Sequence, residues 1–319
     1  MYMATEEDLD RDRLADCVRR HVPDADEVAL TPISTGKFNS GYFVAADGQE
    51  LVLRVAPSKD SVFLFYEVDM MRQEPGIHRL LLEKTSVPVA EIVAYDDSNE
   101  VIDRDFVLMR RLPGQALSES TVADTERVMR RVGECLAQVH ALTTGTYGYI
   151  GEHCPMEAQD RWPDAFRIMW GSLIEDVGRT GHYDADECRA LVGLLDEHMH
   201  LFERPVPSSL LHMDIWAQNI LVDGDGHLSG LVDWDRALWG DPEIEFAVLD
   251  YCGISTPGFW DGYGTPRDET PAARTRTVFY LLYELQKYIV IRHGRSRDPA
   301  AARRCKQQVA GVLRQCFGR

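Results

Sequence analysis

The sequence predicts an α+β protein, with strands concentrated in the first third of the chain and helices after it. Short apolar runs bounded by turn-forming residues are typical of strands, and such runs lie at 28–33, 51–55 and 105–112. Beyond Pro113-Gly114 the pattern changes, because in 128–139 the apolar residues recur every three or four positions, which indicates an amphipathic helix. A chain of 319 residues is long enough to bury a sizeable core in such a fold.

The charge of the chain restricts its partners. The apolar share of 45% and the charged share of 27% are ordinary for a globular protein, but 52 acidic residues against 34 basic ones give a formal net charge of −18. This charge argues against nonspecific binding to nucleic acid or to anionic membranes, so we expect neither as a partner. It favours a cationic substrate or a saline cytoplasm, and general solubility explains it equally well.

The cysteines and the N-terminus predict a cytoplasmic protein. The seven cysteines are scattered and contain no C-x-x-C pair, which favours reduced, mostly buried thiols over disulfides or a zinc site. The first residues, MYMATEEDLDRDR, are acidic and polar, unlike a signal peptide. No run approaches the ~20 apolar residues that a membrane helix needs. The sequence does not predict an oligomeric state.

The most informative stretch, residues 211–241, predicts a β-hairpin. Two short apolar runs, 220–222 and 228–232, are joined by the turn Asp223-Gly224-Asp225-Gly226. Two such runs around a Gly/Asp turn are the sequence pattern of a hairpin.

This hairpin would bring polar side chains together. Asn219 directly precedes the first run and Asp233 directly follows the second, while Asp214 lies on the loop that leads in. Amide and carboxylate oxygens suit Mg²⁺ that is bound together with substrate phosphates. A further carboxylate could accept a proton from an attacking hydroxyl. The alternative is that Asp214 and Asn219 cap turns and that Asp233 ends a strand.

The motif His212-x-Asp214-x-x-x-x-Asn219, the later Asp233-Trp234-Asp235 and the Trp-Gly-Asp-Pro sequence that ends at Pro242 resemble one known family. They resemble the catalytic and metal loops of the aminoglycoside phosphotransferase family, a branch of the protein-kinase-like fold. The resemblance implies two lobes. Residues 1–111 would form a β-rich N-lobe that binds nucleotide phosphates, and residues 112–319 would form a mainly helical C-lobe with the catalytic and metal loops and the substrate site. Asp-Trp in place of Asp-Phe-Gly favours a small-molecule kinase over a protein kinase.

The resemblance also implies a reaction and residue roles. ATP, or GTP, would transfer its γ-phosphoryl group to a hydroxyl of a small molecule, such as an aminoglycoside or another cationic or sugar-like compound. Asp214 would act as the base, and Asn219 and Asp233 would bind Mg²⁺. His212 and Asp241 would support the site. The alternative is a nucleotide-binding pseudokinase or a regulatory protein without turnover.

Upstream residues would supply the nucleotide half of the site. Arg54 stands where kinase-like folds place a strand lysine, and Glu74 stands where their helix carries its partner. Main-chain groups from Arg110 to Leu112 would hold the adenine. Small and polar residues between two predicted strands would cover the phosphates, and they are Ser34, Gly36, Lys37, Asn39 and Ser40. An ordinary hairpin turn, with Lys37 exposed to solvent, is the alternative there.

Substrate contacts are expected in two segments. Residues 145–183 mix aromatic and acidic side chains, which suits a wall for a cationic or sugar-like ligand, and Trp170 is the candidate there. A pair of helices packed on the lobe is the alternative reading. Residues 255–264, predicted as a loop, offer Trp260. Asp235 is a third candidate, although it could also serve the metal or a turn.

Helical spacing predicts the remaining elements. The ranges are 9–21, 66–82, 128–140, 190–202, 274–293 and 300–317. Pro75 is either a break in its helix or the true start of it. Asp241 before Pro242 predicts an N-cap with proline in the first turn. His140 fits a buried or capping histidine better than a metal ligand, because it has no metal-spaced partner.

Overall fold

The computed structural model describes residues 9–34, 38–121 and 124–318. The chain forms two compact units. The first, called here the sheet unit, comprises Met1–Ser61, Asp69–Thr121 and Gln218–Asp235. The second, called the helical unit, comprises Val62–Val68, Val122–Ala217 and Arg236–Arg319. The lobe boundary at residue 111 stays a prediction.

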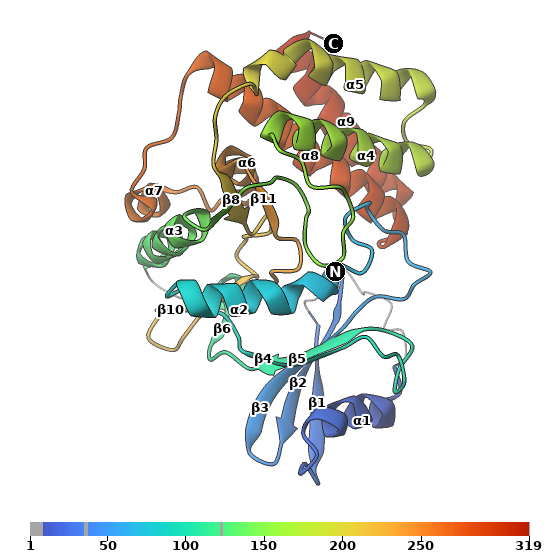
Figure 1. The fold of residues 1–319 in the computed structure, drawn as a ribbon, viewed down its shortest axis with the longest axis vertical. Helices are drawn as coiled ribbons and strands as arrows, with labels where there is room; N and C mark the ends of the chain where they lie inside the picture. The colour runs from blue at the N-terminus through green and yellow to red at the C-terminus, as the bar shows by residue number, and fades with distance from the viewer. Residues whose placement is uncertain (1–8, 35–37, 122–123, 319) are drawn as a thin grey trace. The chain divides into compact units, whose positions relative to one another are not determined.

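The sheet unit contains a five-stranded antiparallel sheet in the order β1-β2-β3-β5-β4. Its strands are β1 Val28–Ile33, β2 Ser40–Ala46, β3 Gln49–Val55, β4 Ile92–Asp96 and β5 Phe106–Arg110. The predicted strand at 28–33 is confirmed with the same bounds. The helix α1, Arg11–His21, lies beside β1 (Figure 1).

Alternation along β3 places one cation away from the apolar core. Leu51, Leu53 and Val55 are fully buried in the core cluster to which α1 contributes Leu14. Successive side chains of a strand point to opposite faces, so Arg54 lies on the other face of the sheet.

The predicted helix over 66–82 is wrong in its first part. The short 3₁₀ helix η1 spans Met70–Gln73, and the α-helix α2 begins at Glu74 and ends at Lys84. Pro75 is in the first turn of α2, where its missing N–H costs nothing, so it marks the true start of the helix. Residues 62–68 belong to the helical unit instead.

The predicted hairpin is confirmed. Strands β9, Ile220–Val222, and β10, Leu228–Leu231, pair antiparallel with Leu231 opposite Ile220. The short strand β6, Gln115–Ala116, adds to the other edge of β9. The 3₁₀ helix η2, Leu117–Glu119, follows it.

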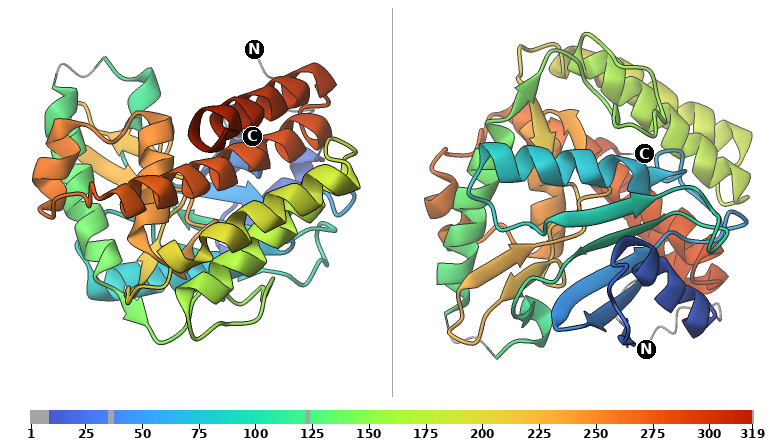
Figure 2. Two further views of the ribbon diagram at one scale, coloured as in Figure 1. Left: turned by 90° about the horizontal axis from the view of Figure 1, so that it is seen from above. Right: turned by 60° about the horizontal axis from the view of Figure 1, so that its bottom comes forward.

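The helical unit is built from α-helices and one small sheet, β11-β8-β7. Its helices are α3 Thr125–His140, α4 Trp162–Arg179, α5 Ala185–His198, α6 Pro242–Cys252, α7 Pro257–Tyr263, α8 Pro271–Gly294 and α9 Pro299–Phe317, with the 3₁₀ helix η3 Met199–Leu201. Its strands are β7 Thr143–Thr144, β8 Ser208–Leu211 and β11 Leu238–Gly240. Helices α8 and α9 pack side by side, as do α4 and α5 (Figure 2).

The loop predicted at 255–264 is wrong, because residues 257–263 form α7, which packs on α3. The glycines there serve close packing rather than a loop. A Cβ on Gly133 would lie 2.1 Å from the carbonyl oxygen of Phe259, and one on Gly262 would lie 1.9 Å from that of Arg130. The two helices therefore approach backbone to backbone.

The state of the cysteines and the length and polarity of the helices can be compared with the expectations from the sequence. All seven cysteines are free, as predicted, but only Cys17 and Cys135 are buried. In the described part of the chain, every helix is too short or too polar to span a bilayer.

Candidate active site

In the sheet unit, Arg54 is the centre of a cluster of carboxylates. Its guanidinium donates to Glu74 through one nitrogen and to Asp233 and Asp235 through another, with 3.0 Å to the Oδ2 of Asp235. Glu74 is fully buried and Asp235 is 5% exposed, whereas about a third of the Asp233 side chain is open. Strand β3, helix α2 and the segment after β10 each supply part of this cluster.

The cluster carries more negative than positive charge. Burial alone would raise the pKa of Glu74, but the charge of Arg54 and a hydrogen bond from His78 lower it. Burial raises the pKa of Asp235 well above its usual range, and the neighbouring charge of Asp233 raises it further. Three carboxylates share one guanidinium, and the raised pKa of Asp235 shows that a further negative charge is unfavourable there unless another cation binds.

The hairpin brings the backbone of Asn219 next to the residue before Asp233. The N–H of Val232 donates to the carbonyl oxygen of Asn219 at 3.0 Å, so Asp233 follows immediately after this contact. Asp233 has a φ of +72°, the left-handed region that aspartate tolerates better than most residues. An amide, a carboxylate and an excess of negative charge fit a divalent cation that prefers oxygen ligands, such as Mg²⁺.

The predicted phosphate loop reaches the same cluster. The side-chain amide of Asn39 donates to the Oδ2 of Asp235 at 2.8 Å. Ser40 is the first residue of β2, and Ser34 lies just after β1. Gly36 and Lys37 lie outside the described residues.

The predicted adenine segment offers one open main-chain donor. The N–H of Arg110 donates to Glu91 and the N–H of Arg111 donates to Glu50, at 2.9 and 3.1 Å. The N–H of Leu112 bonds to no other described residue. The Arg110 side chain reaches Gln49, so a contact with a base would come from the backbone of Leu112.

In the helical unit, Asp214 follows a clamped peptide. Met213 has a φ of +65°, which is strained for a side chain of this size. Its N–H donates to Glu245 at 2.6 Å, and its carbonyl oxygen accepts from Arg236 at 2.6 Å. His212 Nδ1 accepts from the N–H of Asp214 at 3.2 Å, which suits the bracing role expected of His212.

Glu245 is the deepest part of this clamp. It is fully buried on α6 and also accepts from the N–H of His212 at 3.2 Å and pairs with His140 at 2.7 Å. Burial would raise its pKa, but the hydrogen bond and charge of His140 lower it. His140 in turn contacts the Tyr263 hydroxyl, so it is the satisfied buried histidine that its spacing predicted.

Charged residues that sequence reasoning missed surround Asp214. Arg236 pairs with Glu284 at 3.0 Å, and Lys287 pairs with Glu284 at 2.5 Å. The Nζ of Lys287 lies 3.9 Å from the Oδ1 of Asp214. The sequence signal for this group is the spacing of Glu284 and Lys287, which lie one turn apart on a long helix, where opposite charges can pair.

The substrate candidates differ in their surroundings. Trp170 is 1% exposed and its indole N–H donates to the carbonyl of Leu191, so it is a core residue with no surface to offer a ligand. The expectation for Trp170 is therefore wrong. Trp260 is half-buried and donates to Ser255 at 2.9 Å. Asp235 is held by Arg54 rather than directed at open surface.

Asp241 supports α6. It caps the helix by accepting from the N–H of Glu243 at 3.1 Å, which is the predicted N-cap. It also pairs with Arg204 at 2.6 Å and accepts from Tyr280 at 2.9 Å. Helix α6 carries Glu245, so Asp241 helps to fix the start of the helix that clamps the Asp214 loop.

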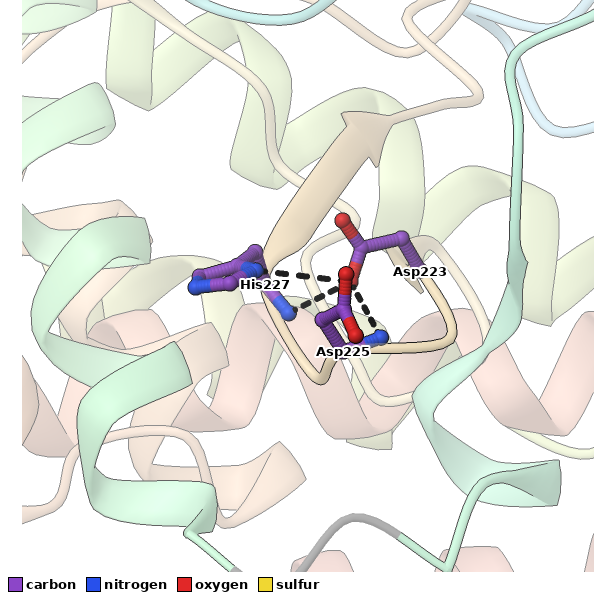
Figure 3. Close-up of side chains that lie close together, drawn as sticks. All are labelled: Asp223, Asp225 and His227. Atoms are coloured by element: carbon purple, nitrogen blue, oxygen red, sulfur yellow. Dashed lines mark hydrogen bonds and ion pairs between the residues drawn. The ribbon is translucent and has the colours of Figure 1, made fainter.

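A second group of potential metal ligands lies at the tip of the hairpin: Asp223, Asp225 and His227 (Figure 3). Asp223 accepts from the backbone N–H groups of Asp225 and His227 at 3.0 and 2.8 Å. These bonds lower the pKa of Asp223 and close the turn. The carboxylate of Asp223 therefore has a structural partner, unlike the uncompensated charge around Arg54.

Comparison with known proteins identifies the family. Residues 29–276 match the family model of the phosphotransferase enzyme family. A probable ketoamine kinase of Staphylococcus aureus is 24% identical over 298 residues, covering 88% of this chain and 93% of that protein. A hygromycin-B 4-O-kinase of Escherichia coli is 22% identical, covering 69% of this chain and 61% of that protein.

The fold agrees with this match. A Haemophilus somnus protein assigned as a fructosamine-3-kinase superposes with a TM-score of 0.70 at 16% identity, covering 94% of this chain and 96% of that chain. The predicted kinase-like α+β fold is thus confirmed, and the family match confirms that the chain is of the phosphotransferase class. The chain belongs to the phosphotransferase enzyme family.

Proposed function

We propose that this enzyme transfers the γ-phosphoryl group of MgATP to a hydroxyl of a ketoamine, a sugar-like molecule that carries an amine. The main observation that supports binding of MgATP is the Arg54 cluster, in which three carboxylates share one guanidinium. The excess of carboxylates over cations in this cluster favours the binding of a divalent cation such as Mg²⁺.

In this proposal the sheet unit binds the nucleotide. Asn219 and Asp233 would hold Mg²⁺, and the ion would supply positive charge that neutralises the phosphates. Arg54, fixed by Glu74, contacts the phosphates, and its planar fork allows it to keep a carboxylate partner at the same time. The open N–H of Leu112 binds the adenine.

The helical unit supplies the base. Asp214 accepts the proton of the attacking hydroxyl, and a third of its side chain is exposed, so an acceptor can reach it. Glu245 and Arg236 hold the peptide before it from both sides. The carboxylate is thereby oriented before the substrate arrives.

The acceptor class rests on the relatives. Those named as probable ketoamine kinases align with 79–88% of this chain, against 69% for the hygromycin-B kinase. The net charge of −18 suits a substrate that carries an amine. Hygromycin B, which the name of that relative gives as its substrate, is the second candidate.

A coupled ADP-release assay tests the acceptor. Fructosyl-lysine, fructose, hygromycin B and homoserine are compared with ATP and then with GTP. We expect fructosyl-lysine to exceed fructose at least about tenfold in kcat/KM, because the amine adds a charge contact. Turnover of hygromycin B or homoserine without turnover of fructosyl-lysine would replace the proposed acceptor. Faster turnover with GTP would replace the nucleotide.

A further inference from the structure

A buried lysine stands beside the proposed base. Lys287 on α8 is 4% exposed, and its Nζ lies 2.5 Å from the Oε1 of Glu284 and 3.9 Å from the Oδ1 of Asp214. Lysine is seldom buried unless it is paired, because desolvation of an ammonium is costly. The position of Lys287 therefore needs an electrostatic reason.

Glu284 does not fully provide that reason. It also pairs with Arg236, whose guanidinium is buried and donates to the loop before Asp214. Two cations sharing one carboxylate leave one positive charge. Among the described residues, Asp214 is the other carboxylate within ion-pair distance of Lys287.

The contact between Lys287 and Asp214 is loose. A separation of 3.9 Å is beyond hydrogen-bond length, so the ammonium does not donate to Asp214. An ammonium has three donors, and the ion pair with Glu284 occupies one side of it. The face of Tyr288, 4.8 Å away, contributes no acceptor. Lys287 therefore has donors to spare near the reacting groups.

We propose that Lys287 is a further catalytic residue, which donates to the phosphoryl group as it is transferred beside Asp214. This inference rests on the proposed function, because it takes Asp214 as the base. The attacking oxygen lies within about 3 Å of the base and about 3–3.5 Å from phosphorus. The phosphoryl oxygens thus come within reach of an ammonium that is 3.9 Å from the same carboxylate and sits on a flexible stem.

The test measures binding of a transition-state mimic and needs no knowledge of the acceptor. Lys287→Met removes the ammonium and keeps the unbranched apolar stem, Lys287→Arg restores the charge, and Arg274→Met on the exposed side of the same helix is the control. Lys287→Gln is the second neutral variant if the methionine variant does not fold. Calorimetry compares MgADP alone with MgADP plus aluminium fluoride, which mimics a phosphoryl group in transfer.

We expect aluminium fluoride to tighten MgADP binding in the wild type and in Arg274→Met. The two neutral variants should lose about 10²-fold of this gain, the cost of one preorganised donor, while their affinity for MgADP alone stays within about twofold. Lys287→Arg should recover most of it. An equal gain in Lys287→Met and the wild type would overturn the inference for Lys287 alone. Absence of MgADP binding in the wild type would overturn the proposed function and this inference with it.

Discussion

The two charged clusters of this molecule differ in how they are balanced. In the sheet unit, Arg54 faces three carboxylates, Glu74, Asp233 and Asp235. In the helical unit, the carboxylates of Asp214 and Glu284 meet two cations, Arg236 and Lys287. The Arg54 cluster therefore has more carboxylates than cations, whereas the Asp214 cluster has equal numbers of carboxylates and cations.

This difference indicates what each cluster is for. An excess of carboxylates is costly unless a cation joins them, and this is why we propose that the Arg54 cluster binds a metal. A balanced buried network instead fixes the positions of its members, and the Asp214 loop is strained enough to need it. In our proposal, a bound metal completes the Arg54 cluster, whereas the Asp214 loop is held in place before any ligand binds.

The largest effect on activity is expected when the proposed base, Asp214, is neutralised. Asp214→Asn keeps the shape of the side chain and should lower kcat by about 10²–10⁴-fold, the usual contribution of a general base. MgATP affinity, measured by calorimetry, should stay unchanged, because the metal cluster is intact. Turnover near the wild-type rate would show that Asp214 is not the base.

The sheet cluster is tested by removing its cation. Arg54→Met removes the cation that three carboxylates share and should lower the free energy of unfolding by about 3–5 kcal/mol in metal-free buffer. Urea unfolding with and without Mg²⁺ measures this, and Mg²⁺ should recover part of the loss. Arg54→Lys is the matched control, since it keeps the charge without the fork and should lose less. If Arg54→Met is as stable as the wild type in metal-free buffer, the three carboxylates do not carry an excess of negative charge that Arg54 offsets.

The clamp before Asp214 predicts a smaller effect. Glu245→Gln offers one acceptor oxygen where two now accept, so one backbone N–H loses its partner, at a cost of about 1–3 kcal/mol in unfolding free energy. kcat should fall by about tenfold because Asp214 is less well oriented, with MgATP affinity unaffected. A fall in MgATP affinity with unchanged kcat would contradict the division between the clusters.

The hairpin tip should contribute least. Asp223→Asn keeps an oxygen that can accept from Asp225 and His227, so the turn should persist. Mg²⁺-dependent ATP binding should match the wild type, because this exposed group is not the metal site. Loss of that dependence would move the metal from the Arg54 cluster to the turn.

Local patterns were enough to predict the parts of the molecule that depend on nearby residues. The strand at 28–33, the hairpin around residue 224 and the Asp241 cap all follow from turn chemistry and periodicity. The contact between Arg54 and Glu74 was expected from motif positions, and the structure contains it.

The rest depends on packing between distant segments. The segment predicted as a loop at 255–264 forms α7, which packs closely on α3 through glycines of both helices. Glu245, Arg236 and Lys287 look like ordinary charged residues of amphipathic segments, and only the fold brings them to the Asp214 loop. Trp170 was expected to contact a ligand, but the sequence does not show whether an aromatic side chain is buried in the core or lines a site.

The central claim is that the Arg54 cluster binds the metal of MgATP. It is tested most directly by titrating ATP into wild-type protein and into Asp233→Asn at several Mg²⁺ concentrations, with Asp223→Asn as the matched exposed substitution. The account predicts that Mg²⁺ tightens ATP binding in the wild type and in Asp223→Asn, and that Asp233→Asn loses this dependence. An unchanged Mg²⁺ dependence in Asp233→Asn would contradict it.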